Sequence, residues 1–269
     1  MNDAAIGVFD SGMGGLTVMR ALRARLPQER FVYLGDTARL PYGTKSADTV
    51  RRYALQAATA LTRRGVKLVV IACNTASVSL PALKDALAPL PVVGVIEPGA
   101  EAALAAANGR PIAVIATEGT VKGGAYVRAI ERLGGANVAQ QACPLFVPMS
   151  EEGLTQGPIA EAIAHRYLDP VLATVPKPRC LLLGCTHYPA LQDVIARVAG
   201  PEVMLVDSAA TTAEAVERLL KEKDLAAPPR ASAPPEFLVT DAPDRFARVG
   251  EIFLGEPIDP GTVELVDLQ

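Results

Sequence analysis

The chain of 269 residues has no tryptophan, only two histidines, and four cysteines that never form a C-x-x-C pair. Closely spaced cysteine pairs build structural zinc sites and disulfide frameworks, so their absence argues against both kinds of scaffold. No apolar run approaches the roughly 18 residues that a membrane helix requires, and the start of the chain lacks the pattern of a secretory signal. We therefore expect a cytoplasmic protein whose thiols stay reduced.

An excess of charge of one sign is also lacking. The formal net charge is −3, and acidic and basic residues are interspersed along the chain. No cluster of basic and aromatic side chains predicts a nucleic-acid surface. Hydrophobic residues make up 50% of the chain, which is ample for a packed core. The length allows one large domain or two small ones.

Short apolar runs alternate with longer stretches of helical periodicity. The runs are nearly continuously apolar rather than alternating, as expected of parallel strands that are covered on both faces. We predict strands at 4–9, 30–35, 67–72, 92–96, 111–116, 136–142, 179–184, 203–206 and 236–240. We predict helices at 15–26, 46–64, 76–88, 119–133, 155–173, 189–199, 209–222 and 242–254. The alternation predicts an α/β fold, and two parallel sheets fit the internal similarity of the chain better than one. The Pro-rich segment 221–236 is predicted to be a surface loop.

Two of the predicted strands end in the same way. The segments KLVVIACNTAS (67–77) and RCLLLGCTHYP (179–189) each run from an apolar stretch through a small residue to Cys and then Thr. Ligands of open parallel sheets bind beyond the carboxyl ends of the strands. The polar residues at predicted strand ends are Asp10, Ser11, Asp36, Thr37, Cys73, Asn74, Thr75, Thr117, Cys185, Thr186, His187, Asp207 and Ser208. Together they predict a polar site at a sheet edge, although Asp36, Thr117, Asp207 and Ser208 equally suit helix caps.

The four cysteines allow several interpretations. Cys143 and Cys180 fit apolar packing, because cysteine is often a small buried hydrophobe. Cys73, Cys185 and His187 could be zinc ligands, but C-x-H is not the close pair that structural zinc prefers. A redox pair is disfavoured because C-x-x-C spacing is absent. The loop DSGMGG (10–15) lacks the P-loop and dinucleotide signatures, so close approach of a substrate to its backbone is favoured over a phosphate site.

Paired acid–base catalysis fits the two strand-end thiols best. Cys73 and Cys185 each precede a predicted helix, and a helix N-terminus lowers the pKa of a nearby thiol. A thiolate can remove a proton and a thiol can donate one. Two such groups facing each other across a carbon atom could deprotonate one face and reprotonate the other, which inverts a stereocentre.

Seven segments, in order along most of the chain, resemble those of the glutamate racemases, within the aspartate/glutamate racemase family. They are IGVFDSGMGGLTV (6–18), YLGDTARLPYGTKS (33–46), IACNTAS (71–77), IATEGTVKGGAY (115–126), PLFVPMSEEG (144–153), LLGCTHYPAL (182–191) and FLGEPI (253–258). The resemblance implies cofactor-independent interconversion of L- and D-glutamate, which provides D-glutamate for peptidoglycan in the cell wall. It also implies two similar flavodoxin-like α/β domains with open parallel sheets, related by a pseudo-twofold, with the active site in the cleft between them. The domains expected are 1–97 plus 207–269, and 98–206.

The resemblance also implies roles for individual residues. It assigns the two catalytic bases to Cys73 and Cys185, with Asp10 and His187 as auxiliary catalytic groups. The substrate contacts that it implies are Asp10, Ser11, Tyr42, Gly43, Asn74, Thr75, Thr186 and His187. Glu151 or Glu152 falls where the family carries a further acidic residue, and Thr117 is a further candidate at its strand end. No metal and no cofactor are expected. Glutamate is the expected partner, a homodimer is left open, and neither nucleic acid nor a membrane is expected.

Two other functions stay open at this point. One is a racemase for aspartate or another small substrate, against which the DSG, CNT and GCTHYP segments argue together. The other is a nucleotide-binding or regulatory α/β module without catalysis. The second thiol at an equivalent strand end argues against that module, because binding alone needs neither thiol.

Overall fold

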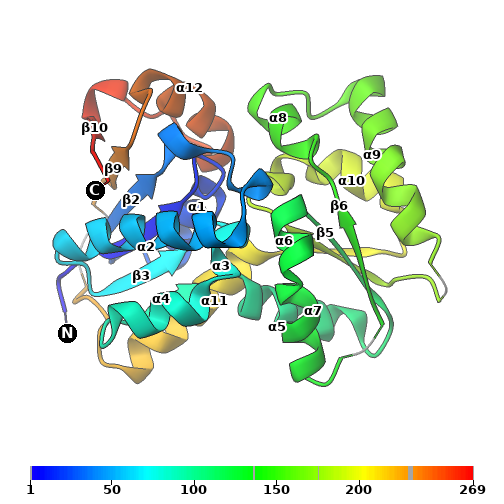
Figure 1. Cartoon of the computed structure of the whole chain (residues 1–269), viewed down its shortest axis with the longest axis horizontal. Coiled ribbons are helices and arrows are strands. Elements are labelled where there is room, and N and C mark those ends of the chain that lie inside the picture. The colour runs from blue at the N-terminus through cyan, green and yellow to red at the C-terminus, as the bar shows by residue number, and fades with distance from the viewer. Residues whose placement is uncertain (1, 136, 175, 230–232, 269) are drawn as a thin grey trace.

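The computed structural model describes residues 2–135, 137–174, 176–229 and 233–268, and its strands form two separate parallel sheets (Figure 1). The strands are β1 (Ile6–Asp10), β2 (Phe31–Gly35), β3 (Leu68–Ile71), β4 (Val92–Gly94), β5 (Ile112–Ala116), β6 (Val138–Ala142), β7 (Cys180–Gly184), β8 (Met204–Asp207), β9 (Glu236–Val239) and β10 (Val263–Leu265). The six-stranded sheet has the order β10-β9-β2-β1-β3-β4, and the four-stranded sheet has the order β6-β5-β7-β8. The predicted α/β fold with two parallel sheets is confirmed.

Helices lie between the strands and cover both sheets. They are α1 (Leu16–Arg25), α2 (Ala47–Arg63), α3 (Asn74–Ser77), α4 (Leu80–Leu87), α5 (Ile96–Ala107), α6 (Glu118–Gly123), α7 (Ala125–Arg132), α8 (Phe146–Glu151), α9 (Gly157–Leu172), α10 (Gln192–Ala199), α11 (Ser208–Glu222) and α12 (Pro243–Leu254), with the 3-10 turns η1 (Thr37–Arg39), η2 (Tyr42–Thr44), η3 (Tyr188–Leu191) and η4 (Pro260–Thr262). None of the helices formed by the described residues has the length and apolar character needed to cross a bilayer.

The two sheets repeat one four-strand arrangement. In the larger sheet the neighbours β2-β1-β3-β4 are all parallel, and in the smaller sheet the neighbours β6-β5-β7-β8 are all parallel. In each four-strand unit, the strand that comes first in the chain is second in the sheet, and the strand that comes third in the chain is also third in the sheet. Strands β3 and β7, which precede Cys73 and Cys185, occupy the same position in the two units. The similarity between the two cysteine segments thus corresponds to a repeat of topology.

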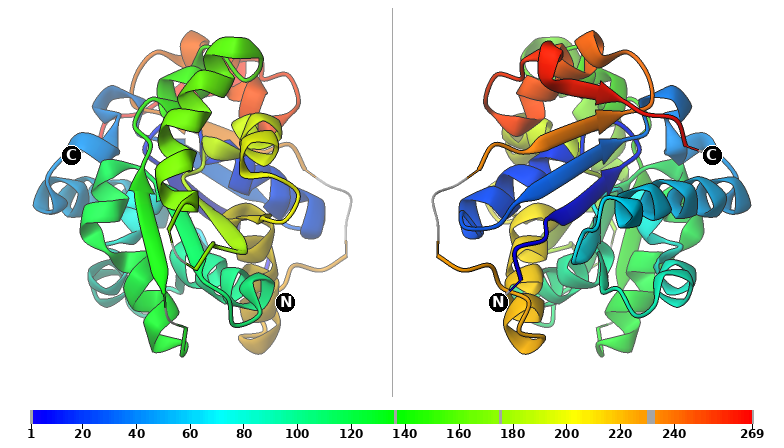
Figure 2. Two further views of the ribbon diagram at one scale, coloured as in Figure 1. Left: turned by 90° about the vertical axis from the view of Figure 1, so that its right-hand side faces the viewer. Right: turned by 90° about the vertical axis from the view of Figure 1, so that its left-hand side faces the viewer.

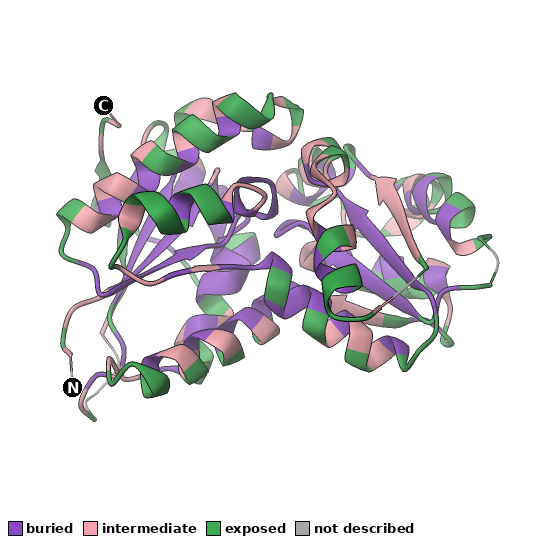
Figure 3. Ribbon diagram, turned by 60° about the horizontal axis from the view of Figure 1, so that its bottom comes forward, coloured by how far each residue is buried: buried purple, intermediate pink, exposed green. Residues whose placement is uncertain are grey.

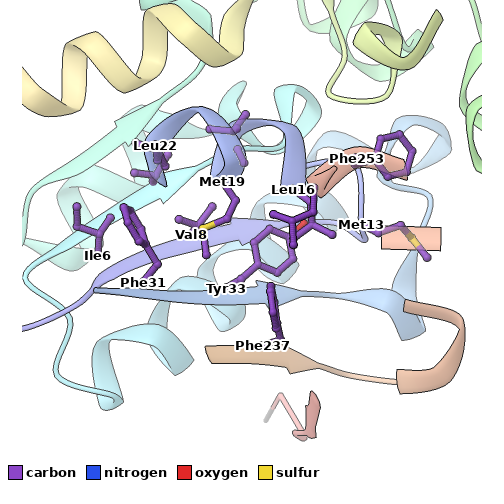
Figure 4. Close-up of a cluster of buried hydrophobic side chains, with 14 of the residues drawn as sticks. Ile6, Val8, Met13, Leu16, Met19, Leu22, Phe31, Tyr33, Phe237 and Phe253 are labelled. Atoms are coloured by element: carbon purple, nitrogen blue, oxygen red, sulfur yellow. The ribbon is translucent and has the colours of Figure 1, made fainter. Parts of the chain in front are cut away.

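Each sheet buries apolar side chains on both faces. Helices α1, α11 and α12 pack on one face of the larger sheet, while α2 and α4 pack on the other. Figure 4 shows part of the first of these cores, where Leu16 and Met19 of α1 meet Val8, Phe31 and Tyr33 of the sheet. Helices α8, α9 and α10 cover one face of the smaller sheet, and α5 and α7 cover the other. The inner strands β1, β2, β3, β5 and β7 are accordingly buried, the edge strands β6, β8 and β10 are partly exposed, and the outer faces of the helices are exposed (Figure 3).

The last part of the chain returns to the larger sheet. After β8 completes the smaller sheet, α11, β9, α12 and β10 add to the larger one, and both chain ends lie on its side in Figure 1. Figure 2 shows β9 and the C-terminal segment along the outer edge of this sheet. The domain boundaries that the sequence predicts, at 97/98 and 206/207, stay predictions. The predicted strand start at 136 and residues 230–232 of the predicted loop lie outside the described residues.

All nine predicted strands are present, and several helices differ from prediction. The predicted helix 76–88 is two helices, because the Cys73 sulfur caps α3 and Pro81, which has no N–H, sits in the first turn of α4. The predicted helix 119–133 breaks into α6 and α7 at Gly124, whose φ of 58° is left-handed. The predicted strand 92–96 ends at Gly94, and α5 begins at its last residue. The sequence patterns do not predict helices α5 and α8 or strand β10.

Candidate active site

A cavity of about 260 Å³ lies where the carboxyl ends of β1 and β3 face those of β5 and β7. Both Cys73 and Cys185 line it, and their relative exposures are only 5% and 6%. The other predicted residues on its walls are Ser11, Tyr42, Gly43, Asn74, Thr75, Thr117, Glu151, Thr186 and His187. A larger hollow of about 380 Å³ beside Lys84 and Arg218 is lined by no cysteine or histidine. The two strand-end thiols therefore meet in one enclosed space.

Cys73 sits at the start of α3, with Ser11 beside it. Its thiol lies 3.4 Å from Ser11 Oγ, and its sulfur accepts the backbone N–H of Ala76 at 3.4 Å. The helix terminus lowers the pKa of Cys73 through the Ala76 N–H, as expected, but the expected net lowering is wrong for this thiol. Burial, with a further contribution from the Asp10 carboxylate, raises the pKa of Cys73 to about 12 despite these two hydrogen bonds. At neutral pH Cys73 is therefore a neutral thiol.

Asp10 ends β1 and is completely buried behind the wall of the cavity rather than on it. The backbone N–H of Gly12 donates to its Oδ2 at 2.9 Å. Burial raises the pKa of Asp10, while the positive charge of His187 and backbone N–H groups act in the opposite direction. Asp10 thus acts on Cys73 through its charge, and no hydrogen bond between the two residues is present among the described residues.

Cys185 lies at the start of a relay of side chains. Its sulfur is 3.8 Å from His187 Nδ1, and His187 Nε2 is 3.1 Å from Glu151 Oε1. Arg245 Nη2 donates to the other carboxylate oxygen of Glu151 at 2.8 Å. Burial lowers the pKa of His187, but its contacts with Cys185 and Glu151 outweigh that effect and raise the pKa to about 10. The rings of Phe253 and His187 pack edge-on with their centroids 4.9 Å apart, and this contact restricts the His187 ring.

Asn74 lines the cavity and carries an unpaired donor. Its Oδ1 accepts the hydroxyl of Tyr126 at 2.6 Å, which fixes the orientation of the amide. The Nδ2 group is buried and has no hydrogen-bond partner among the described residues. Because a buried donor is costly to leave unpaired, this geometry suits a bound acceptor such as a carboxylate.

Three threonines form a hydroxyl cluster on the wall that joins the two sheets. Thr75 lies 2.9 Å from Thr117 and 3.2 Å from Thr120, and these two hydroxyls are 3.0 Å apart. Thr117 also caps α6, so it is both a helix cap and a residue of the cavity wall. Gly43 approaches the cluster closely, because a Cβ there would lie 2.8 Å from Thr117 Cβ. Hydroxyl groups that can donate or accept make this wall suitable for a polar ligand.

The remaining strand-end residues divide between structural and site roles. Tyr42 lines the cavity, yet its hydroxyl donates to buried Asp36, so the ring rather than the hydroxyl faces the ligand space. Asp207 caps α11 by accepting the N–H of Ala209 at 2.7 Å. Ser208 is the first residue of that helix.

The glycine-rich loop 10–15 brings the backbone of the larger sheet against the turn after β7. A Cβ at Gly14 would lie 2.4 Å from His187 Cε1 and Nδ1, and 2.6 Å from Thr186 Oγ1. Real Cβ atoms essentially never show contacts under 3.0 Å, so any larger residue here would displace the His187 ring or the loop. Thr17 reinforces the contact by donating to the carbonyl of Thr186 at 3.2 Å. The loop thus serves close packing across the cleft.

The structure distinguishes the two adjacent acids and adds residues that sequence reasoning missed. Glu151 lines the cavity, whereas Glu152 is exposed and does not line it. The residues missed are Gly12, Leu40, Pro41, Thr120, Tyr126, Val147, Pro148, Arg245 and Phe253. Most lie on helices or in turns away from strand ends, where no local pattern marks them. Cys143 and Cys180 are fully buried in apolar clusters, as predicted.

Metal binding by Cys73, Cys185 and His187 is one interpretation of the sequence. Within the described ranges, no group of three or more His, Cys, Asp or Glu side chains is arranged to hold a metal ion.

Comparison with known proteins identifies the family. The model of the Asp/Glu/Hydantoin racemase family matches residues 10–216. A glutamate racemase of Geobacter metallireducens is 48% identical over 98% of this chain and 97% of its own. The structure of glutamate racemase from Francisella tularensis in complex with D-glutamate is 37% identical, with a TM-score of 0.91 over 100% of this chain and 99% of that one. The structure from Thermus thermophilus in complex with β-chloro-D-alanine is 45% identical, with a TM-score of 0.88 over 99% and 98%. The chain therefore belongs to the Asp/Glu/Hydantoin racemase family.

Proposed function

We propose that the cavity interconverts L- and D-glutamate, with Cys73 and Cys185 as paired acid–base catalysts and without a cofactor. The enzyme is an amino-acid racemase, an isomerase. In one direction Cys73 removes the α-proton while Cys185 donates a proton to the opposite face. In the other direction the two thiols exchange roles.

The observation that carries this proposal is the meeting of two thiols from equivalent strands in one cavity. Cys73 follows β3 and Cys185 follows β7, so the repeated topology supplies one sulfur from each sheet. A substrate bound between them would present its α-carbon to both. Two bases on opposite faces perform an inversion, whereas neither thiol is needed for binding alone.

Removal of an α-proton places negative charge on the α-carboxylate, which takes on enediolate character. Donors aimed at that charge lower the barrier when water is excluded. Asn74 Nδ2 is an unpaired donor of this kind, and Ser11, Thr75 and Thr186 add hydroxyl groups on the same walls. Their placement supports a carboxylate subsite between the thiols.

The two thiols have opposite electrostatic surroundings. Cys73 lies near the carboxylate of Asp10, whereas Cys185 lies near His187, whose pKa of about 10 leaves it positively charged at neutral pH. The imidazolium can stabilise negative charge on the Cys185 sulfur. On the other side, the ammonium group of an arriving amino acid would favour the thiolate of Cys73 by opposing the charge of Asp10.

Exchange with deuterated solvent tests the two-base mechanism. The thiol that returns a proton will have exchanged with solvent before substrate binds, so product formed early should carry deuterium at the α-carbon. Substrate recovered at the same time should carry almost none. Deuterium in early recovered substrate would contradict the paired-thiol mechanism.

Substitution of the thiols provides the second test. Cys73→Ala and Cys185→Ala should each abolish racemisation in both directions, because each direction uses one thiol as base and the other as acid. Cys180→Ala is the matched control, since Cys180 is buried in an apolar cluster and does not line the cavity. Circular dichroism of L-glutamate and L-aspartate, followed without added cofactor, measures the activity. Comparable turnover of aspartate would instead favour the related aspartate racemases.

Several further predictions belong to the same proposal. The enzyme is expected to supply D-glutamate for peptidoglycan in the cytoplasm. Residues 1–97 plus 207–269 are expected to form one domain and residues 98–206 the other. A homodimer stays an open prediction that sedimentation velocity would test.

A further inference from the structure

One ionic contact joins the two halves of the cavity wall on the Cys185 side. Arg245 belongs to α12, which packs on the larger sheet, while Glu151 ends α8, which packs on the smaller one. Arg245 Nη2 lies 2.8 Å from Glu151 Oε2. The side chain of Glu151 is 11% exposed and that of Arg245 is 40% exposed, so the pair lies at the rim with its carboxylate turned inward.

The two oxygens of the Glu151 carboxylate have different partners. Oε1 lies 3.1 Å from His187 Nε2, while Oε2 accepts from Arg245. A carboxylate held at both oxygens has its plane fixed, which in turn fixes the direction of the His187 contact. The opposite ring nitrogen of His187 lies 3.8 Å from the sulfur of Cys185. Three consecutive contacts therefore connect Arg245 to the thiol.

We propose that Arg245 is a positioning residue for the Cys185 half of the reaction: it holds the Glu151 carboxylate so that Glu151 aligns His187 with Cys185. The inference rests on the proposed racemisation by Cys73 and Cys185. Arg245 itself does not line the cavity, so it acts through Glu151 rather than on the substrate.

The charged groups along the relay predict that the effect of Arg245 on activity depends on pH. Glu151 faces His187 and Arg245, and His187 in addition faces Cys185 and Asp10. Burial alone would raise the pKa of Glu151, but hydrogen bonds and positive charge from His187 and Arg245 lower it. Without Arg245, Glu151 would take up a proton at higher pH, and a neutral carboxylic acid accepts the hydrogen bond from His187 more weakly than a carboxylate does.

The first experiment compares Arg245→Gln with Arg248→Gln, a matched control on the same helix whose side chain is exposed. Arg245→Gln should lower kcat/KM about tenfold, as expected when a hydrogen-bonding partner of a site residue is lost. The loss should be equal in both directions, because two enantiomers are equally stable. The acidic limb of the pH profile of kcat/KM should move to higher pH in Arg245→Gln and stay in place in Arg248→Gln. Arg245→Lys, which keeps the positive charge, should restore most of the activity.

A double-mutant cycle shows whether Arg245 acts through Glu151. In a Glu151→Gln background, Arg245→Gln should change kcat/KM by less than about twofold, because the carboxylate that it positions is gone. A full additional loss in that background would show that Arg245 acts elsewhere, and would overturn the proposal. Equal activity of Arg245→Gln and Arg248→Gln in the wild-type background would also overturn it.

A measurement without substrate separates this proposal from the proposed function. The chain has only two histidines, so His165→Gln leaves the His187 ring as the single imidazole signal in a ¹⁵N-histidine spectrum. The Nε2–H proton of His187 should be protected from exchange in that protein, and the protection should be lost in Arg245→Gln but kept with Arg248→Gln. If Arg245→Gln lost this protection but the wild-type protein did not racemise glutamate, only the proposed function would be contradicted, and the role of Arg245 would stand. Unchanged protection would overturn the role of Arg245, whatever the activity.

Discussion

Replacement of Gly14 by alanine tests how rigidly the loop 10–15 sets the position of His187. The backbone at Gly14 does not have a positive φ, so alanine meets no conformational penalty and the effect comes from contact alone. The new Cβ would lie 2.4 Å from two atoms of the His187 ring, whereas ordinary contacts begin at 3.4 Å. The ring or the loop must therefore move by about 1 Å.

The ring has little room to move. Glu151 Oε1 lies 3.1 Å from His187 Nε2, and the centroid of the Phe253 ring lies 4.9 Å from that of the His187 ring. Displacement of a catalytic group by about 1 Å costs roughly 100-fold in rate, and overpacking costs about 1–3 kcal/mol of stability. We expect Gly14→Ala to fold, to lose a few degrees of thermal stability, and to lose about 100-fold in kcat/KM.

The assay follows circular dichroism of both glutamate enantiomers, with thermal unfolding of the same preparation. Gly12→Ala is the comparison in the same loop: Gly12 also lines the cavity, but its Cβ would contact the Leu40 side chain, at 3.3 Å and 3.9 Å, and neither His187 nor Thr186. It should retain far more activity than Gly14→Ala. If Gly14→Ala kept more than about half of the wild-type kcat/KM, the position of His187 would not depend on this contact, and the reasoning from displacement would fail.

The remaining predictions concern the amide donor, the thiols and metals. Tyr126→Phe removes the hydroxyl that orients Asn74, so KM for glutamate should rise about tenfold with a smaller change in kcat, measured by steady-state kinetics. Since the pKa of Cys73 is about 12, its alkylation by iodoacetamide should accelerate steadily as the pH rises to about 10, and glutamate should protect it, as peptide mass spectrometry would show. Activity should survive chelation and dialysis; a loss that zinc restores would revive the metal interpretation of Cys73, Cys185 and His187.

The sequence predicts most of this fold because its parallel strands are buried on both faces. Runs such as LVVI in β3 and CLLLG in β7 are almost entirely apolar, and all nine predicted runs are strands, including β6, which carries two glutamines. Strand β10 escapes prediction because it has three residues, of which only Val263 is buried. Helix α5 escapes it because Pro98 and Gly99 stand in its first turns and alanines fill much of the rest, so its periodicity is weak. Helix α8 is only six residues long and contains Pro148.

The candidate site is predictable from sequence where it lies at strand ends, and less so elsewhere. The edge of a parallel sheet collects the residues that follow its strands, so the sequence pattern groups Cys73 with Asp10 and Ser11 at one sheet edge and Cys185 with Thr117 at the other. Tyr126 and Arg245 reach the site from helices whose patterns express only packing and solvation. Their roles depend on how the two sheets face each other, and no local feature of the sequence encodes that arrangement.

The return of the C-terminal segment to the larger sheet has a consequence for synthesis of the protein on the ribosome. The four-stranded sheet is complete once β8 has emerged, whereas the six-stranded sheet must wait for β9 and β10. Until then, the edge of β2 that later pairs with β9 is open to any other strand. A nascent or truncated chain that stops before β9 therefore presents an unpaired, apolar strand edge, which is the kind of surface that chaperones cover and aggregates extend.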